Sequence, residues 1–311
     1  MEYINRALGT TLQVTHEIFP VVTLTGPRQS GKTTLCRHLY PDMPYINFEN
    51  VQTGLLFNDN PVGFIDSFSN GAIIDEAQIE PTVFRALQTV VDEDRHVGRR
   101  RKFIITGSSN FSIMANSSES MAGRTAPLTL LPLSVNEILQ NRKYDISTNE
   151  LMYLGGYPQI WTSPISAAEI ILQSYIDTYV ERDLRQLMNI KDLNKFIKFL
   201  GLCAGRVGTE LNRSSLAVET GVTVATIDSW LSVLEASYVI WMLPPWSTNI
   251  NKRLTKSSKL YFCDTGLLCY LLGIKEAKQL DNYPLRGAIF ENMVVNNFLK
   301  AAYNLSLIHI S

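Results

Sequence analysis

Apolar segments and amphipathic stretches alternate along the first 140 residues of the chain. Short β-branched runs such as "FPVVTLT" predict buried strands, whereas "PTVFRALQTVVDEDR" at 81–95 has the spacing of an amphipathic helix. Strands that alternate with helices at this pitch predict a parallel sheet covered by helices on both faces, which is an α/β fold. Further strands are predicted at 45–50, 71–77, 101–109 and 126–134.

The pattern becomes mainly helical after residue 140. The clearest helix is predicted at 174–187, and "GGYP" at 155–158 interrupts the helical pattern. Farther on, a short helix, a turn at Gly221 and a second helix precede the strand-like segment "YVIWMLPPW". This order predicts a helix-turn-helix with a wing strand, and a small helical bundle with a hairpin is the alternative. We expect four parts, at 1–140, 141–200, 201–258 and 259–311.

The first predicted strand leads into the pattern G-x-x-x-x-G-K-[ST], which runs from Gly26 to Thr33 and is followed by a helical segment. In such a P-loop the glycines let successive N–H groups point at phosphate oxygens, and the helix N-terminus adds partial positive charge. We expect Lys32 to reach the β- and γ-phosphates of ATP, and the Thr33 hydroxyl to ligate Mg²⁺. The predicted nucleotide-binding residues of this loop are Gly26, Pro27, Arg28, Gln29, Ser30, Gly31, Lys32, Thr33 and Thr34.

Two carboxylates follow the predicted strand in "AIIDEAQ". Its apolar residues extend to Ile74, so Asp75 and Glu76 emerge at the carboxyl end of the strand, where open α/β sheets bind their ligands. We expect Asp75 to hold Mg²⁺ through water and Glu76 to act as general base toward the attacking water. A surface strand end is the alternative for an isolated Asp-Glu pair, but the preceding P-loop favours the catalytic interpretation.

Two further elements of phosphoryl-transfer chemistry are predicted after the carboxylates. The strand in "RKFIITGSSN" ends in polar residues, with Ser108 as the candidate γ-phosphate sensor. Thr106, Ser109 and Asn110 are alternatives for that role, and helix capping by a serine is another interpretation. Arg124, in the loop before the next strand, is the candidate for stabilising charge on the transferring phosphoryl group. A solvated loop arginine is its alternative.

The composition narrows the class of protein. The 311 residues are 45% hydrophobic and 18% charged with a net charge of −1, which is typical of a globular protein without a general basic field. DNA binding would therefore require a local basic patch. No apolar run reaches the roughly 18 residues of a membrane span. The chain start has no signal- or transit-peptide character, and the four cysteines form no CxxC pair. These features predict a cytoplasmic protein without a membrane partner.

Several motifs together resemble a known family. "TGPRQSGKTT", "IIDEAQ", "ITGSS" and "AGRTAPLTLLPLSVNEI" resemble AAA-type P-loop ATPases that carry a C-terminal DUF4143 domain, and "GGYPQI", "VERDL" and "RGAIFENMVVNNF" are similar to the second half of such proteins. The resemblance implies an AAA-like ATPase core, a helical and winged-helix middle, and a C-terminal domain related to PD-(D/E)xK nucleases.

The end of the sequence departs from that family. By the resemblance, Glu291 lies on the first helix of the nuclease-like domain, but the chain stops at Ser311 before the strands that would carry the other carboxylates and the lysine. A metal-dependent nuclease needs carboxylates clustered around its Mg²⁺. We therefore expect 259–311 to be an incomplete nuclease-like domain, with a truncated or spurious end, and predict no nuclease activity for this chain.

The function predicted from these residues is hydrolysis of ATP to ADP and phosphate, which drives a conformational change in the C-terminal region. An ATP-switched DNA-binding protein is one alternative. A P-loop small-molecule kinase is another, although the Asp75–Glu76 pair is more typical of a hydrolase. AAA-type proteins generally take an arginine from a neighbouring subunit, so the resemblance also implies a homo-oligomer. Whether Arg124 acts within its own subunit or on a neighbour stays open at this point.

Overall fold

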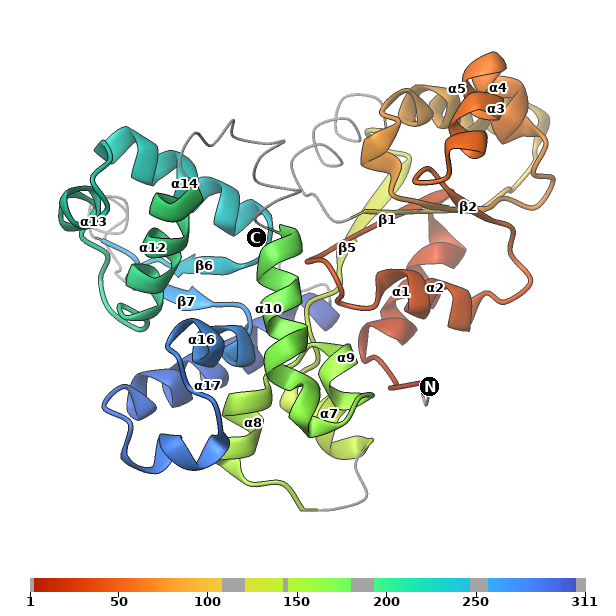
Figure 1. Ribbon diagram of the computed structural model, residues 1–311. Coiled ribbons are helices and arrows are strands. Elements are labelled where there is room, and N and C mark those ends of the chain that lie inside the picture. The colour runs from red at the N-terminus through yellow and green to blue at the C-terminus, as the bar shows by residue number, and fades with distance from the viewer. Residues whose placement is uncertain (1–2, 108–120, 142–144, 180–192, 247–256, 306–311) are drawn as a thin grey trace. The chain divides into compact units, whose positions relative to one another are not determined.

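The computed structural model describes residues 3–107, 121–141, 145–179, 193–246 and 257–305, and the chain divides into two compact units (Figure 1). We call Asn5–Leu131 with Ala301–Ser311 the P-loop unit, and Met1–Ile4 with Pro132–Lys300 the helical unit. The last three of the four parts expected from the sequence thus lie largely in the helical unit. The division into four parts itself stays a prediction.

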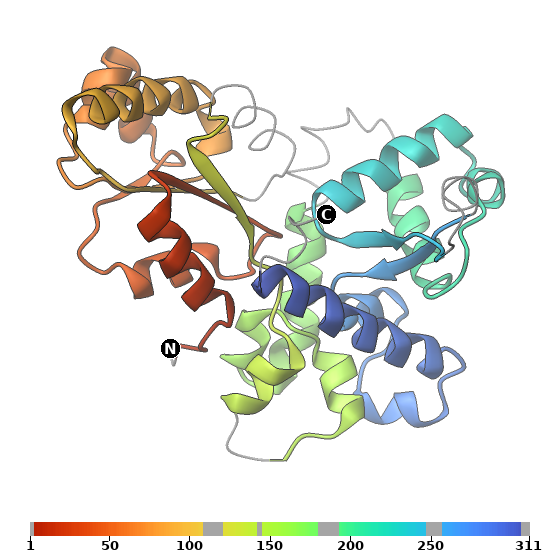
Figure 2. The ribbon, with the colours of Figure 1, turned by 180° about the vertical axis from the view of Figure 1, so that it is seen from behind.

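The P-loop unit is built on a five-stranded sheet in the order β2-β3-β4-β1-β5. All neighbouring strands are parallel, as predicted. Helices α1 and α2 lie on one face of this sheet and α5 on the other (Figures 1 and 2). The α/β fold predicted from the alternating pattern is therefore confirmed. The strands are β1 (Val21–Thr25), β2 (Tyr45–Asn47), β3 (Ile73–Asp75), β4 (Phe103–Thr106) and β5 (Thr125–Thr129). The helices are α1 (Leu8–Ile18), α2 (Lys32–Leu39), α3 (Val51–Asp59), α4 (Pro61–Asp66), the 3₁₀ turn η1 (Ala77–Ile79) and α5 (Thr82–Val97).

Alternate residues of the strands are buried toward opposite faces of the sheet. Phe103 and Ile105 of β4 share one hydrophobic cluster with Phe84 and Leu87 of α5. Ile104, which lies between them, is equally buried and points to the other face because side chains alternate along a strand. Burial on both faces explains why these strands appear in the sequence as continuous apolar runs.

The strand register places the predicted polar residues at one edge of the sheet. Leu24 of β1 is level with Thr106 of β4, and Ile74 of β3 is level with Ile105. The residues that end these strands, Thr25, Asp75 and Thr106, therefore meet at the carboxyl edge. Because the strands are parallel, the loops before them lie at the opposite edge.

The helical unit surrounds one large hydrophobic cluster and a two-stranded antiparallel sheet. The predicted order of helix, Gly221 turn and helix is present as α13 and α14, with Gly221 at φ 71°. Of the helix predicted at 174–187, α10 covers the start, and most of the remainder lies outside the described residues. The elements before the sheet are α7 (Val135–Gln140), α8 (Thr148–Leu154), α9 (Pro158–Trp161), η2 (Ile165–Ala167), α10 (Ala168–Thr178), α12 (Leu193–Ala204), α13 (Arg213–Thr220) and α14 (Val224–Ala236). The sheet and the elements after it are β6 (Ile240–Leu243), β7 (Lys259–Phe262), α16 (Thr265–Leu271), η4 (Ala277–Asn282) and α17 (Arg286–Asn304).

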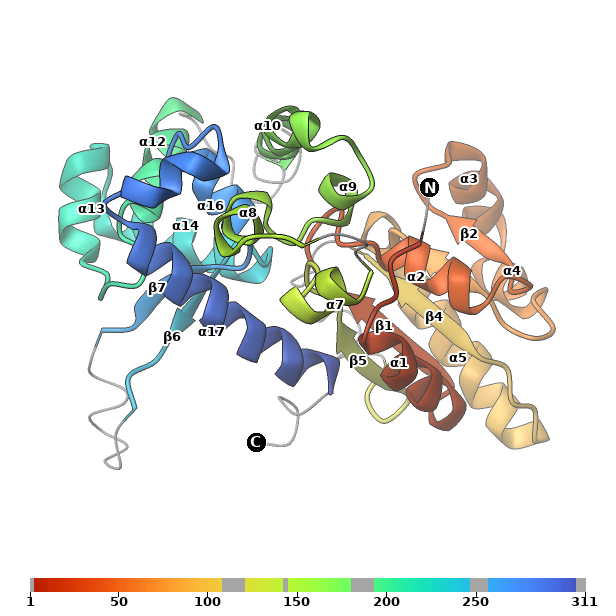
Figure 3. The ribbon, with the colours of Figure 1, turned by 90° about the horizontal axis from the view of Figure 1, so that it is seen from below.

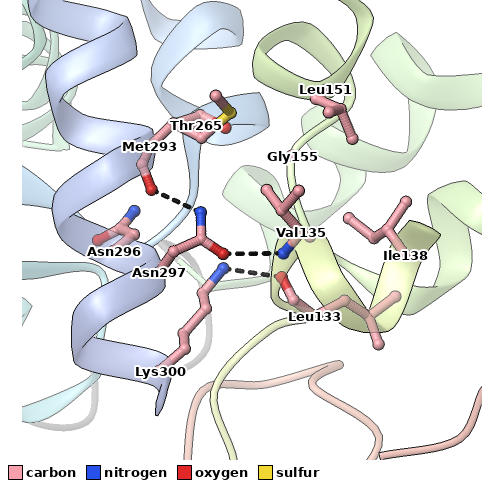
Figure 4. Close-up of a pocket in the computed structure, with 11 residues that line it drawn as sticks. Leu133, Val135, Ile138, Leu151, Gly155, Thr265, Met293, Asn296, Asn297 and Lys300 are labelled. Atoms are coloured by element: carbon pink, nitrogen blue, oxygen red, sulfur yellow. Dashed lines mark hydrogen bonds between the residues drawn. The ribbon is translucent and has the colours of Figure 1, made fainter. Parts of the chain in front are cut away.

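Buried polar side chains of α17 bind the backbone of neighbouring segments. Asn292 and Asn296 donate to the carbonyl of Phe262 at 2.9 and 2.7 Å, which fixes α17 along β7 (Figure 3). Near the start of α7, Asn297 accepts from the backbone N–H of Val135 at 2.9 Å, and Lys300 donates to the carbonyl of Leu133 at 2.9 Å (Figure 4). Asn296, Asn297 and Lys300 line a small pocket, but their bonds to neighbouring backbone hold the segments together.

Candidate nucleotide-binding site

The predicted P-loop connects β1 to α2 with a backbone that two glycines make possible. Gly26 has φ 143°, and a Cβ atom there would lie 2.2 Å from the carbonyl oxygen of Leu130. Gly31, directly before α2, is left-handed at φ 91°. A larger residue at Gly26 would clash with backbone that cannot move aside easily, so the loop requires the glycines of the motif. The first N–H groups of α2 face the loop without partners in the helix.

Lys32 is folded against this loop. Its side chain is buried, and the Nζ atom donates to the carbonyls of Gly26 and Pro27 at 2.9 and 2.8 Å. Burial lowers the pKa of Lys32 to about 8, and the nearby carboxylates of Glu76 and Asp75 act in the opposite direction. The ammonium group therefore lies within the loop, close to where phosphate oxygens would bind.

Asp75 is the centre of the hydrogen bonds at the sheet edge. The Thr33 and Tyr45 hydroxyls both donate to its Oδ2 atom, each at 2.7 Å. The Thr106 hydroxyl and the backbone N–H of Glu76 donate to Oδ1, the latter at 3.1 Å. An ionised carboxylate offers about four lone-pair sites, so these donors fill the carboxylate and fix its orientation.

The pairing of Thr33 with Asp75 fits a Mg²⁺ ion. Hydroxyl and carboxylate oxygens are the hard donors that Mg²⁺ binds, commonly with several of its waters retained. A hydroxyl that donates its proton to a carboxylate keeps its own lone pairs available for a cation. The donor set is therefore compatible with the predicted roles, in which Thr33 binds the ion directly and Asp75 binds it through water.

Glu76 has a strained backbone and a partly buried carboxylate. It adopts the left-handed region at φ 53°, which for a residue other than glycine costs about 1–3 kcal/mol and is most frequent at functional sites. Burial and the charge of Asp75 raise the pKa of Glu76. The Gln78 side chain donates to one of its carboxylate oxygens through Nε2. These features are those expected of a carboxylate held ready for proton transfer.

The remaining predicted loop residues differ in accessibility. Pro27 and Ser30 are buried, Arg28 is half-buried, and Gln29 and Thr34 are exposed. Gln29 is also left-handed, at φ 58°. The Ser30 hydroxyl has no hydrogen-bond partner among the described residues. Ser108, Ser109 and Asn110 lie outside the described residues, so of the sensor candidates only Thr106 is placed beside Asp75.

Arg124 lies away from the P-loop residues and Asp75 of its own chain. It precedes β5, and the residue after it, Thr125, is level with Val21 at the start of β1. Four residues of strand, about 13 Å, therefore separate its end of the sheet from the end that carries the P-loop. Its guanidinium forms an ion pair with both carboxylate oxygens of Asp92, at 2.6 and 2.7 Å. The parallel arrangement thus places Arg124 away from Lys32 of its own chain.

Three residues at the site were not predicted from the sequence. Arg6 donates to the carbonyls of Ser30 and Leu131 at 2.7 and 2.6 Å, which links the P-loop to the segment after β5. Tyr45 reaches Asp75 from the neighbouring strand, and Gln78 contacts Glu76. For Tyr45 the available signal was its place at the start of the predicted strand 45–50. Arg6 lies too far from the P-loop in sequence for a motif to reveal it.

Two family models match the chain. An AAA domain matches residues 19–139, which include the P-loop, Asp75 and Glu76, and a domain of unknown function, DUF8612, matches residues 146–278. Residues 19–139, which we call the AAA domain after this match, have the parallel sheet and the P-loop of a P-loop NTPase fold. The match and the motif together support nucleotide binding at the P-loop.

One solved structure and two curated proteins are similar to most of this chain. A Walker-type ATPase of Pyrococcus abyssi superposes with a TM-score of 0.56 at 15% identity, covering 86% of this chain and 96% of the other. That likeness concerns the fold alone. Two proteins described as uncharacterized, from Mycobacterium bovis and Mycobacterium tuberculosis, are each 34% identical over 279 residues, or 89% of this chain. The chain spans 61% of the length of these relatives.

The region after the AAA domain matches a different model from the expected one. DUF8612 covers it in place of DUF4143, so the nuclease-like domain and the winged helix stay predictions. Glu291 accepts a hydrogen bond from the Tyr261 hydroxyl at 2.6 Å and pairs with Lys259 at 3.2 Å. Within the described ranges, no group of three or more His, Cys, Asp or Glu side chains is placed to hold a metal. In the same ranges, no helix combines the length and the apolar character that a membrane crossing requires.

Proposed function

We propose that the AAA domain hydrolyses ATP to ADP and phosphate with Mg²⁺, and that the nucleotide state changes the conformation of the helical unit. The observation that carries the proposal is the hydrogen bond between Thr33 and Asp75 at the carboxyl edge, directly beside Glu76. A P-loop hydroxyl, a strand-end carboxylate and an adjacent base candidate are the residues that such hydrolysis requires.

Each residue has a distinct role in this proposal. Lys32 leaves the carbonyls of the loop and binds the β- and γ-phosphates. Thr33 and Asp75 hold Mg²⁺, which neutralises phosphate charge when bound. Glu76 accepts the proton of the attacking water, whose oxygen bonds to the γ-phosphorus as the bond to the β-phosphate oxygen breaks. Ser108 senses the γ-phosphate, a role that Thr106 fills if Ser108 does not.

Arg124 is proposed to act on the site of a neighbouring copy of the chain. Its position at the opposite edge of the sheet disfavours a role within its own site. Its side chain is 22% exposed and is paired with Asp92, whose side chain is 36% exposed, so a partner's anionic phosphates can compete for it. This role makes the active protein a homo-oligomer.

The two alternative functions lack a supporting observation. The DNA-binding alternative would use α14, the second helix of the predicted helix-turn-helix, but α14 carries Asp228 and Glu235 and no lysine or arginine. Arg213 of α13 is paired with Asp228 at 2.7 Å. A neutral or acidic helix is unsuited to the phosphate backbone of DNA. No feature of the described residues favours a kinase acceptor site.

Product analysis with γ-labelled ATP and Mg²⁺ tests the proposal. Free phosphate that appears with ADP supports hydrolysis, and a labelled acceptor in place of free phosphate would show a kinase. Lys32→Ala should abolish tight ATP binding, because it removes the cation that faces the phosphates. Lys102→Ala is the matched control, since Lys102 also donates to two backbone carbonyls, those of Glu17 and Phe19, but outside the P-loop. Stimulation of turnover by DNA, measured over a range of salt concentrations, would instead support the DNA-binding alternative.

A further inference from the structure

Tyr45 connects the P-loop helix to the carboxylate at the end of β3. It begins β2, and its hydroxyl donates to Oδ2 of Asp75 at 2.7 Å. Its ring lies under the guanidinium of Arg37, with the Cζ atom of Arg37 5.1 Å from the ring centre. Thr33 and Arg37 are four residues apart on α2, so they occupy the same face of that helix. Tyr45 therefore lies between Arg37 on one side and Asp75 on the other.

The Tyr45 hydroxyl has a specific position among the donors to Asp75. It shares the Oδ2 atom with the hydroxyl of Thr33, while Thr106 and the N–H of Glu76 occupy Oδ1. Without Tyr45, Thr33 would be the one donor to Oδ2 among the described residues, and the carboxylate could rotate toward Thr106.

We propose that Tyr45 is a positioning residue of the Mg²⁺-ATP site, whose hydroxyl holds the Asp75 carboxylate in the orientation that binds the cation together with Thr33. The proposal rests on the proposed function, because it assigns Asp75 and Thr33 to the ion. Residues that orient a metal ligand without touching the metal typically contribute about 10- to 100-fold to metal affinity. Tyr45 acts one step farther out, because Asp75 holds the ion through water, so we expect an effect at the lower end of that range.

Tyr45→Phe is the sharpest variant, because it removes the hydroxyl and keeps the ring against Arg37. Tyr40→Phe is the matched control. Its hydroxyl is buried just after α2 and has no hydrogen-bond partner among the described residues. Both variants lose one phenolic oxygen, but only one of these oxygens touches Asp75.

The test measures the binding of Mn²⁺ by electron paramagnetic resonance, with a non-hydrolysable ATP analogue bound to the protein. Tyr45→Phe should raise the half-saturating Mn²⁺ concentration about 10-fold, and Tyr40→Phe should match the wild type. The Mg²⁺ concentration that gives half-maximal turnover should rise in parallel, while kcat at saturating Mg²⁺ stays near the wild-type value. Binding of the analogue in EDTA should be unchanged, which also shows that the variant is folded.

The outcomes separate this inference from the proposed function. A Tyr45→Phe protein whose Mn²⁺ affinity equals or exceeds that of the wild type would overturn the role of Tyr45. Wild-type protein that binds no nucleotide-dependent Mn²⁺, or whose Mn²⁺ binding survives Asp75→Ala, would overturn the metal site itself. If Tyr45→Phe and Tyr40→Phe weaken Mn²⁺ binding equally, the effect belongs to general packing around α2 and the inference is wrong.

Discussion

Two buried carboxylates, one in each unit, differ in what their hydrogen bonds hold. Asp75 in the P-loop unit accepts from the side-chain hydroxyls of Thr33, Tyr45 and Thr106. Asp264 in the helical unit accepts from the backbone N–H groups of Gly156 and Leu267, at 2.6 and 2.9 Å. Both are nearly inaccessible, at 4% and 1% exposure, so burial alone does not distinguish them.

The two carboxylates differ in whether their hydrogen-bond donors can turn away to bind a ligand. A side-chain hydroxyl can rotate toward a cation or a phosphate, whereas a backbone N–H at a helix start or tight turn cannot leave without unfolding the segment. Asp264 caps the start of α16 and binds the "GGYP" turn, where a Cβ atom on Gly155 would lie 2.3 Å from its Oδ1 atom. We infer that the buried carboxylate of Asp75 serves ligand binding, whereas the buried carboxylate of Asp264 stabilises the fold of the helical unit.

The largest effect is expected for Arg124, the site candidate that lies away from the carboxyl edge. Arg124→Ala should bind ATP almost normally and lose about 10³- to 10⁵-fold in turnover, the contribution of an arginine supplied to another subunit in related P-loop systems. Because the residue would act on a neighbour, mixing this variant with Lys32→Ala should restore part of the turnover. A coupled assay for ADP release measures the turnover of the single variant and of the mixture.

Asp92→Asn is the matched control for Arg124. It breaks the same half-buried ion pair but leaves the arginine, so its turnover should stay near that of the wild type. Normal turnover by Arg124→Ala would remove Arg124 from the mechanism. If Arg124→Ala is inactive and the mixture restores no turnover, Arg124 acts within its own chain, contrary to what the strand register indicates. That result would also remove this argument for an oligomer.

A smaller but still large effect is expected for Glu76. Glu76→Gln should keep ATP binding and lose about 10²- to 10⁴-fold in turnover, because an amide cannot accept the proton of the attacking water. Its thermal stability near pH 7 should be equal to or higher than that of the wild type. The raised pKa of Glu76 means that the fold favours the protonated form, so this contribution to stability is present at low pH and is lost as pH rises through the folded-state pKa. Unchanged kcat would make Glu76 an ordinary strand-end carboxylate.

The sequence predicted the parts of the site that lie within short motifs. The P-loop, the Asp75–Glu76 pair and the parallel sheet follow from local pattern, because strand, glycine loop and helix are continuous in sequence. Tyr45 and Arg6 act across elements: Arg6 binds carbonyls of residues 30 and 131, and no local pattern records such a contact. These contacts depend on how the strands are ordered, which periodicity alone does not give.

The place of Arg124 shows a different limit. Its loop precedes a predicted strand of a predicted parallel sheet, and that order already assigns it to the edge opposite the P-loop. The order of elements in the sequence was therefore enough to place Arg124 at the edge opposite the P-loop. The strand register shows this placement directly. The region after the AAA domain shows the opposite limit. Its short motifs led to the expectation of DUF4143, whereas the model that matches residues 146–278 is DUF8612.

In the helical unit, we expect substitution of Asp264 to lower the stability of the fold and to leave turnover nearly unchanged. Asp264→Ala should lower the free energy of unfolding by about 2–4 kcal/mol, because the N–H groups of Gly156 and Leu267 lose their acceptor in a buried site. Turnover of the folded protein at 25 °C should stay within about twofold of the wild type. Asp264→Asn, which keeps one acceptor oxygen, should lose less stability. Chemical denaturation and the ADP-release assay measure both quantities, and a folded Asp264→Ala protein without turnover would contradict the contrast between the two carboxylates.

The smallest effect concerns pH and the Lys32 ammonium. With a pKa of about 8 in the protein without nucleotide, Lys32 is largely protonated at pH 7 and largely neutral at pH 9. Phosphate oxygens favour the charged form, so nucleotide binding raises this pKa and takes up a proton. The association constant for ATP should therefore fall as pH rises above about 8, by at most tenfold per pH unit. Lys32→Arg, which stays charged throughout, should bind more weakly but with little dependence on pH in this range. Isothermal titration between pH 7 and 9.5 measures the slope, and a flat wild-type profile would mean that the buried ammonium is held charged by Asp75 and Glu76 before any phosphate arrives.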